Sequence, residues 1–344
     1  MDLKQLKSSP VMVRHAKNPL LTPKDIPFPS DNVYNVGVIK YQGKYVMIFR
    51  NDFERGEKEM DDFYSGRSPK HPAARICLGL ATSADGVAWA IEPKPVFQLE
   101  TDEIERAYDP RLTVVDGKVV MCFATDTKHG LRAGIAVTED FHHFDVKHFT
   151  VPDNRNMVLF PERIGGLYVR LERPFPVYSR GGKDRFDLWA SRSPDLEFWG
   201  RSDLVLAVED VPFSNDKIGP AAPPVKTARG WLTSFHAVDR DDTRGKNGWE
   251  PKWTKRYTAG IMLLDLQNPS KVVGMCKEPL LVPEAPYEVA GGMRNNVIFP
   301  GGMILEPTGE VKLYYGAADT VTCLATAHVD DLLSLCTSPR HGAK

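Results

Sequence analysis

The stretch YQGKYVMIFR (41–50) joins a glycine-containing turn to a run of β-branched, aromatic and aliphatic residues, and related stretches recur four more times along the chain. A tight turn followed by an apolar run is typical of the second half of a β-hairpin. The other copies are VDGKVVMCFA (115–124), IGGLYVRLER (164–173), TARGWLTSFH (227–236) and PTGEVKLYYG (307–316). Five related hairpins in one chain indicate a repeat architecture.

An apolar stretch stands before each of these turns, and two further strand-like stretches follow most of them. The preceding stretches are NVGVIK (35–40), DPRLTVV (109–115), NMVLFPERI (156–164), KIGPAAPPV (217–225) and NNVIFPGGMI (295–304). Four strands in each of five units predict an all-β fold, a five-bladed β-propeller with four-stranded antiparallel blades. We expect one domain over 1–344, with a short N-terminal extension over about 1–17 and a short C-terminal helix over 329–336. The segment NPLL (18–21) is expected to supply the strand that completes the last blade.

The charge balance excludes partners that need a strong overall field. The 344 residues carry 44 Lys and Arg against 45 Asp and Glu, a formal net charge of -1. Such a balance favours neither nucleic acid nor an anionic membrane surface, so any bound anion must be held by a local cluster. The chain also has no apolar run long enough for a secretory signal or a membrane span. We therefore expect a cytoplasmic protein with no nucleic-acid or membrane partner.

Polar residues fall at equivalent positions of the repeat. The first strands are expected to begin at Asn35, Asp109, Asn156, Lys217 and Asn296, with Arg155 directly before Asn156. The second strands are expected to end at Arg50, Ala124, Arg173, His236 and Gly316. A hairpin brings these two ends together, so both rows should meet as one ring around the axis of the propeller, with Asp319 just beyond the last strand. Charged strand ends are common on any surface, but several cations around one principal carboxylate, Asp109, suggest an anionic ligand.

Several of these runs resemble glycoside hydrolase family 130, which consists largely of mannoside phosphorylases. The resemblance extends from about residue 18 to about residue 330, and its motifs occur in the family's order. They are AYDPRLT (107–113), NRNMVLFPERIGGLYVRLERP (154–174), KIGPAAPPVKTARGWLTSFHAVD (217–239), NNVIFPGGMI (295–304) and YYGAADT (314–320). The resemblance implies that Asp109 is the catalytic acid. It implies that Arg155, Arg173, Lys217 and His236 bind phosphate. It also implies that Asn35, Arg50 and Asp319 hold the mannosyl unit, with Asn156 close to both groups.

The implied reaction is an inverting, reversible phosphorolysis of a β-mannoside oligosaccharide to α-D-mannose 1-phosphate. In this family the proton is thought to pass from the acid through the mannosyl 3-hydroxyl. Inorganic phosphate would be the co-substrate, and no metal or other cofactor is expected. The general appearance of the motifs favours a β-1,4 over a β-1,2 linkage. Members of the family often assemble into oligomers, so the sequence leaves open whether this chain forms a homo-oligomer.

Two other functions remain open at this stage. One is hydrolysis of a β-mannoside, in which a carboxylate such as Asp319 or Asp239 would activate water in place of phosphate. The other is a propeller that binds carbohydrate without turnover. Two polar insertions, 51–75 and 239–256, are surface loops or covers of the site. Their aromatic residues could stack on sugar rings or make subunit contacts. These aromatic residues are Phe63, Tyr64, Trp249 and Trp253.

Overall fold

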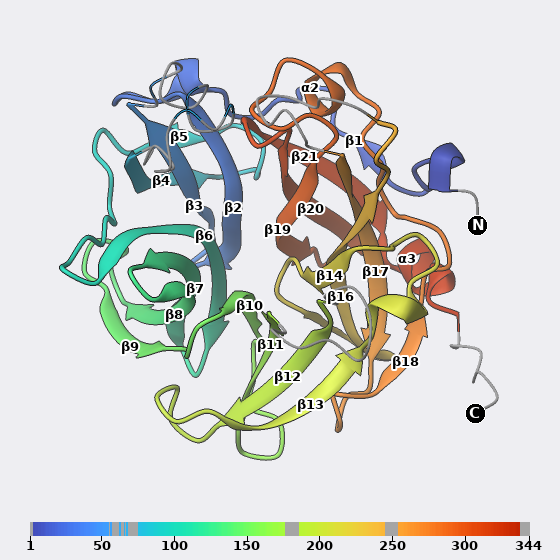
Figure 1. The fold of residues 1–344 in the computed structure, drawn as a ribbon. Coiled ribbons are helices and arrows are strands. Elements are labelled where there is room, and N and C mark those ends of the chain that lie inside the picture. Colours follow the sequence, from blue (N-terminus) through green and yellow to red (C-terminus); the bar gives the residue numbers. More distant parts are fainter. Residues whose placement is uncertain are drawn as a thin grey trace.

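The structure is a β-propeller of five antiparallel sheets around a central axis (Figure 1). It is a computed structural model that describes residues 3–54, 75–175, 186–244 and 254–337, with the single residues 56, 62, 65 and 67. The expected fold class is therefore confirmed. No helix in the described part of the chain is long and apolar enough to cross a membrane.

Each blade has its first strand nearest the axis, and the following strands lie progressively farther out. In the fifth blade the outermost strand comes from the N-terminal segment of the chain. Blade 1 consists of β2 (Asn32–Tyr41), β3 (Lys44–Phe53), β4 (Arg75–Ser83) and β5 (Ala90–Ile91). Blade 2 consists of β6 (Ile104–Val115), β7 (Lys118–Thr127), β8 (Gly130–Thr138) and β9 (Asp145–Phe149). Blade 3 consists of β10 (Asn154–Leu159), β11 (Tyr168–Pro174), β12 (Leu188–Ser193) and β13 (Gly200–Leu206).

Blades 4 and 5 complete the ring. Blade 4 consists of β14 (Lys217–Pro220), β16 (Gly230–Arg240), β17 (Lys255–Leu264) and β18 (Val272–Met275), and β15 (Val225–Thr227) also pairs with β16. Blade 5 consists of β19 (Ile298–Leu305), β20 (Glu310–Ala317), β21 (Val321–His328) and β1 (Val13–Arg14). Short helices lie outside the blades: η1 (Leu3–Gln5), η2 (Pro23–Asp25), η3 (Val208–Asp210), α2 (Pro286–Val289) and α3 (Val329–Leu335).

The N-terminal segment closes the ring, but not through the residues that the sequence suggested. Val13 and Arg14 form β1 and pair with Thr326 and Ala325 of β21. The NPLL segment follows β1 and adds only an isolated bridge between Leu21 and Thr322. The outer strand is thus shorter and lies earlier in the sequence than expected, and Pro19 within NPLL has no backbone N–H to donate to a strand ladder.

In blades 1, 2 and 3 the inner strands begin earlier than the sequence suggested, and their polar residues lie at bulges within them, whereas β14 begins at Lys217 as expected and β19 begins at Ile298, two residues after Asn296. Asn35, Asp109 and Asn156 have φ angles of 50°, 55° and 61°. The pairing register shifts around each of them, between Tyr34 and Gly37 in blade 1 and at the matching points of blades 2 and 3. A bulge leaves a residue out of the ladder and re-aims its side chain, and Asn and Asp tolerate the left-handed conformation best. The repeated Asx residue is therefore a backbone requirement as well as a source of polar groups.

Apolar side chains between neighbouring sheets form the core. A glycine of the third strand faces a phenylalanine ring of the second strand in three blades, as Phe49 with Gly79 and Phe123 with Gly134 show. The third pair is Phe235 with Gly260. A Cβ atom at any of these glycines would lie 2.2–2.3 Å from a ring carbon. This packing fixes the second strands, which carry Arg50 and His236 to the end of the axis where the site forms.

Candidate active site

Asp109 lies where blades 1 and 2 meet, at the end where the inner strands begin. Nδ2 of Asn35 donates to Oδ1 of Asp109 at 2.9 Å, and Nη1 of Arg50 donates to the same oxygen at 3.1 Å. Gly316 of β20 allows this approach, because a Cβ atom there would lie 2.5 Å from Oδ1 of Asn35. The structure thus brings together one residue from each of β2, β3 and β6, as the two rows predicted.

Arg50 is held so that one edge of its guanidinium faces Asp109. Its Nε and Nη2 donate to the two carboxylate oxygens of Asp52 at 2.7 and 3.0 Å. Its Cζ lies 4.6 Å from the ring centroid of Tyr34 and 4.8 Å from that of Tyr108. A bidentate ion pair between two aromatic faces leaves little rotational freedom. The remaining nitrogen, Nη1, therefore points at Asp109.

The surroundings of Asp109 favour its ionised form. Burial by itself would raise the pKa of this carboxyl group. The positive charges of Arg50, Arg111 and Arg155, together with the hydrogen bond from Asn35, outweigh burial and hold the pKa below its ordinary value of 3.8. In the structure without ligand, Asp109 is therefore a carboxylate at neutral pH.

Arg111 is a buried arginine that the sequence reasoning did not single out. It donates to the backbone carbonyl oxygens of Ala221 at 2.6 Å, Pro110 at 2.9 Å and Pro300 at 3.2 Å. These carbonyl groups belong to blades 4, 2 and 5, so the side chain ties three blades together beneath the site. Burial lowers the pKa of Arg111 to about 10. Its position in the quoted run AYDPRLT was a usable signal.

Four basic residues form a cluster at blades 3 and 4. Arg155 and Arg173 are cross-strand neighbours on β10 and β11. Nη1 of Arg173 lies 3.0 Å from Nε2 of His236 on β16, and Lys217 begins the adjacent strand β14. Gly219 makes room for this packing, since a Cβ atom there would lie 2.5 Å from Cε1 of His236 and 3.1 Å from Cδ of Arg173. The sequence-predicted basic set is therefore assembled in space.

Burial and mutual repulsion lower the pKa values within this cluster. The pKa of Arg173 falls to about 9, first through burial and then through the charge of Arg155. Burial followed by the charge of Arg173 lowers the pKa of Lys217 well below 10.5 and that of His236 well below 6.5. His236 is therefore neutral at pH 7, and its Nε2 accepts a hydrogen bond from Arg173. An anion placed among these groups would relieve the repulsion between them.

Several buried polar atoms around Asp109 and in the basic cluster have no hydrogen-bond partner among the described residues. They are Oδ1 of Asn35, Nε of Arg155, Nε of Arg173, Nδ1 of His236 and both amide atoms of Asn156. Buried polar atoms normally have partners, so these atoms mark surfaces that can receive a ligand. They include four donors and two acceptors, a set that suits both anion oxygens and sugar hydroxyls.

Tyr108 connects the acid to the basic cluster and was not among the predicted site residues. Its hydroxyl donates to Oδ1 of Asp126 at 2.5 Å and accepts from Nη1 of Arg155 at 3.4 Å. The same ring carries the guanidinium of Arg50. The tyrosine therefore separates Arg50 from Arg155 and fixes their spacing.

Asp319 lies in the turn after β20, with a φ angle of 49°. Its Oδ2 accepts from Nη1 of Arg294 at 3.3 Å. Burial raises its pKa, Arg294 and Arg50 oppose that effect, and Asp109 adds to it. Asp319 therefore belongs to the same electrostatic neighbourhood as Asp109 and Arg50, and Arg294 is a further site residue that the sequence reasoning missed.

The two polar insertions are only partly visible. Phe63, Tyr64, Trp249 and Trp253 lie outside the described residues. Asp239 is almost fully buried at the start of the second insertion and holds Arg244 and, at 2.8 Å, Arg256. Among the described residues, no group of three or more His, Cys, Asp or Glu side chains could hold a metal ion.

Comparison with known families gives a match over nearly the whole chain. The model of glycoside hydrolase family 130, described as beta-1,4-mannooligosaccharide phosphorylase, matches residues 8–338. A beta-1,4-mannooligosaccharide phosphorylase from Ruminococcus albus is 31% identical over 338 residues, which cover 94% of this chain and 90% of the relative. A 1,2-beta-oligomannan phosphorylase from a Thermoanaerobacter species is 29% identical, with 96% of this chain and 99% of the relative covered.

Solved structures share the fold as well. A beta-1,2-mannobiose phosphorylase from Listeria innocua, in complex with beta-1,2-mannobiose, superposes with a TM-score of 0.78. That structure is 25% identical in sequence, and the match covers 94% of this chain and 99% of the other.

Proposed function

The chain belongs to glycoside hydrolase family 130, and from that premise we propose that it is a phosphorylase of β-mannosides. The proposed reaction is inverting and reversible, and it yields α-D-mannose 1-phosphate and the released sugar. One observation carries the proposal: the buried carboxylate of Asp109 lies beside a cluster of four basic residues that carries donors without a partner among the described residues.

In the proposed mechanism the basic cluster positions phosphate for attack on the anomeric carbon. Arg155, Arg173, Lys217 and His236 hold its oxygens, while Asp109 supplies the proton to the departing sugar through the mannosyl 3-hydroxyl. Phosphate is already an anionic nucleophile, so the site needs to orient it rather than deprotonate it. This requirement explains why one acid is sufficient, whereas an inverting hydrolase needs a second carboxylate as base.

The electrostatics of the site connect phosphate binding to the protonation of the acid. The charges of Arg50, Arg111 and Arg155 keep Asp109 ionised in the absence of phosphate. A bound phosphate would bring negative charge beside Arg155, which belongs both to the basic cluster and to the cations that depress this pKa, and would weaken the positive field at Asp109. The pKa of the acid then rises, so the proton needed for catalysis is acquired in the complex.

The remaining predicted residues would bind the mannosyl unit. Asn35, Arg50 and Asp319 surround Asp109 with donors and acceptors on the sugar side, and the amide of Asn156 lies next in sequence to Arg155. For the linkage we propose β-1,4, supported by the description of the family model and by the Ruminococcus relative. The β-1,2-specific relatives are nearly as similar, so linkage is the point on which the experiment must discriminate.

The structure weakens the proposal of a hydrolase that uses Asp239. That carboxylate is bound by Arg244 and Arg256 and is 1% exposed, so it is not available to activate water. Asp319 is bound by Arg294. A non-catalytic binding propeller would have no need for a carboxylate that is held beside unpaired cationic donors.

The test measures phosphate release from α-D-mannose 1-phosphate with separate acceptor sugars, followed by identification of the product linkage. We expect release that depends on the acceptor and a β-1,4-linked product. A β-1,2-linked product would replace the linkage assignment and keep the reaction type. In the forward direction, release of mannose at equal rates with and without phosphate would contradict phosphorolysis. Binding of mannooligosaccharide without any turnover would support the lectin alternative.

A further inference from the structure

A short closed loop between blades 4 and 5, residues 289–295, places Arg294 beside Asp319. The backbone N–H of Asn296 donates to the carbonyl oxygen of Glu288 at 2.8 Å. This hydrogen bond joins the two ends of the loop formed by residues 289–295. The loop lies on the turn after β20, where the N–H of Arg294 donates to the carbonyl oxygen of Ala318 at 3.1 Å. The side chain of Arg294 then reaches Asp319.

Gly292 permits the close packing of this loop. A Cβ atom at Gly292 would lie 2.4 Å from Cβ of Ala318 and 2.6 Å from its carbonyl oxygen. The N–H of Met293 donates to Oγ1 of Thr320 at 2.8 Å. The loop therefore contacts the residues on both sides of Asp319, so Arg294 and Asp319 are held as a unit.

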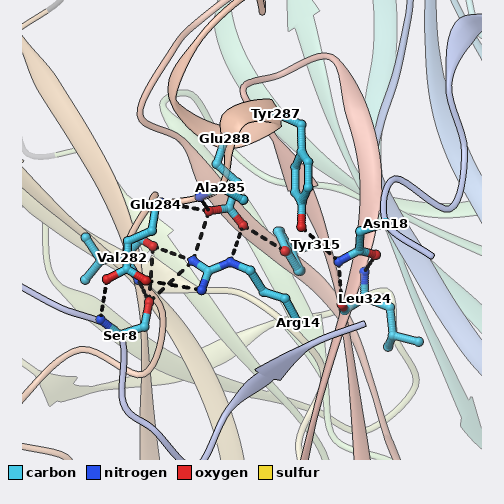
Figure 2. A network of polar contacts seen from close by, with 10 residues as sticks. All are labelled: Ser8, Arg14, Asn18, Val282, Glu284, Ala285, Tyr287, Glu288, Tyr315 and Leu324. Atoms are coloured by element: carbon cyan, nitrogen blue, oxygen red, sulfur yellow. Dashed lines mark hydrogen bonds and ion pairs between the residues drawn. The ribbon is translucent and has the colours of Figure 1, made fainter. Parts of the chain in front are cut away.

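Glu288 fixes the base of the loop through a network that begins at the N-terminal strand (Figure 2). Its Oε1 accepts from Nε of Arg14 and from the hydroxyl of Tyr315, each at 2.8 Å. Its Oε2 accepts from Nη2 of Arg14 at 2.9 Å and from the N–H groups of Glu284 and Ala285 at 2.8 and 2.9 Å. The Glu288 carboxylate is fully buried and accepts from five donors, so its position is fixed.

We propose that Arg294 is a further sugar-binding residue and that Glu288, held by Arg14, positions it. The proposal rests on the proposed function, because it assigns Arg294 to the mannosyl unit beside Asp319. A carboxylate accepts from one hydroxyl of a pyranose while an adjacent guanidinium donates to the neighbouring oxygen. The Arg294 side chain is 32% exposed and that of Asp319 12%, so the arginine forms the outer part of this pair.

The first experiment compares the binding of two ligands by calorimetry in the wild type, Arg294→Ala and Arg163→Ala. Arg163 is a matched control, since its side chain is 38% exposed and pairs with Asp116 in the distant turn between β6 and β7. We expect Arg294→Ala to weaken α-D-mannose 1-phosphate binding by about 10- to 100-fold, the loss of one charged hydrogen bond. Inorganic phosphate should bind within about twofold of the wild type in all three proteins.

The outcomes separate this inference from the proposed function. Failure of the wild type to bind mannose 1-phosphate would contradict the proposed function. Normal binding of mannose 1-phosphate by Arg294→Ala, or an equal loss for both ligands, would overturn only the assignment of Arg294.

A double-mutant cycle tests the positioning role of the network. We expect Arg14→Gln to weaken mannose 1-phosphate binding when Arg294 is present and to have no further effect in Arg294→Ala. The melting temperature should fall in both backgrounds, because Glu288 loses its buried partner. An equal loss of affinity in both backgrounds, or a loss of stability without any loss of affinity, would overturn the positioning role. Tyr315→Phe, which removes one donor to Glu288, repeats the cycle if Arg14→Gln does not fold.

Discussion

Replacing Arg173 by methionine should stabilise the free protein and weaken its binding of phosphate. Arg173 is 1% exposed, and its Nε has no hydrogen-bond partner among the described residues. Burial and the charge of Arg155 lower its pKa from 12.5 to about 9. At pH 7 the guanidinium is charged in both the folded and the unfolded chain. The folded state therefore bears the full free-energy cost of burying this charge beside Arg155. That penalty is relieved only as pH rises from about 9 toward 12.5.

The expected gain follows from this pKa difference. One pKa unit corresponds to about 1.4 kcal/mol, so removing the buried charge can raise the free energy of unfolding by at most about 5 kcal/mol. The substitution also removes the hydrogen bond to His236 and the contacts with the rings of Phe175 and Phe186, together about 2–3 kcal/mol. A net gain of about 2 kcal/mol remains. For a chain of 344 residues this gain corresponds to a rise in melting temperature of about 3 °C.

Thermal unfolding with and without inorganic phosphate measures both effects. Phosphate at 100 times its Kd should stabilise the wild type by about 2.7 kcal/mol. The same concentration should stabilise Arg173→Met much less, because loss of charged hydrogen bonds weakens binding by about 10- to 100-fold. Arg170→Met is the matched control. Arg170 is also buried on β11 but pairs with Glu172 at 2.9 Å, so its loss should destabilise the protein by about 3–5 kcal/mol. A lower melting temperature for Arg173→Met without phosphate, or an undiminished phosphate shift, would refute the reasoning.

Three further predictions concern the acid and the basic cluster. Asp109→Asn should reduce turnover by about 10²- to 10⁴-fold at nearly unchanged melting temperature, and substantial remaining phosphate release would contradict its role. Arg155→Gln removes a cation that depresses the pKa of Asp109, so the pH above which turnover declines should move upward; an unmoved profile would argue against Asp109 as the titrating acid. Gly219→Ala should displace His236 and Arg173 and weaken phosphate binding by about tenfold or more, and calorimetry that shows wild-type affinity would disprove this packing argument.

The sequence by itself determined the architecture and the end of the propeller at which most of the candidate site residues gather. Five hairpin repeats predict a propeller because turn residues and apolar runs act locally. The same periodicity places Asn35, Asp109 and Asn156 at equivalent points, and a hairpin must return Arg50 and His236 to the same end. These inferences needed no knowledge of how the blades pack.

The tertiary structure alone decided which strand closes the ring, where the inner strands begin and what surrounds each functional group. Pairing of Val13 and Arg14 with β21 depends on contacts between residues more than 300 positions apart, and local propensity carries no information about them. The bulges at Asn35 and Asp109 appear only in the pairing register.

Electrostatic surroundings depend on tertiary structure for the same reason. Arg294, Arg111 and Tyr108 join the site because separate segments converge on one axis, and the sum of burial and charge sets each pKa. Sequence gives the identity of a titratable group, but its pKa is a property of the space around it.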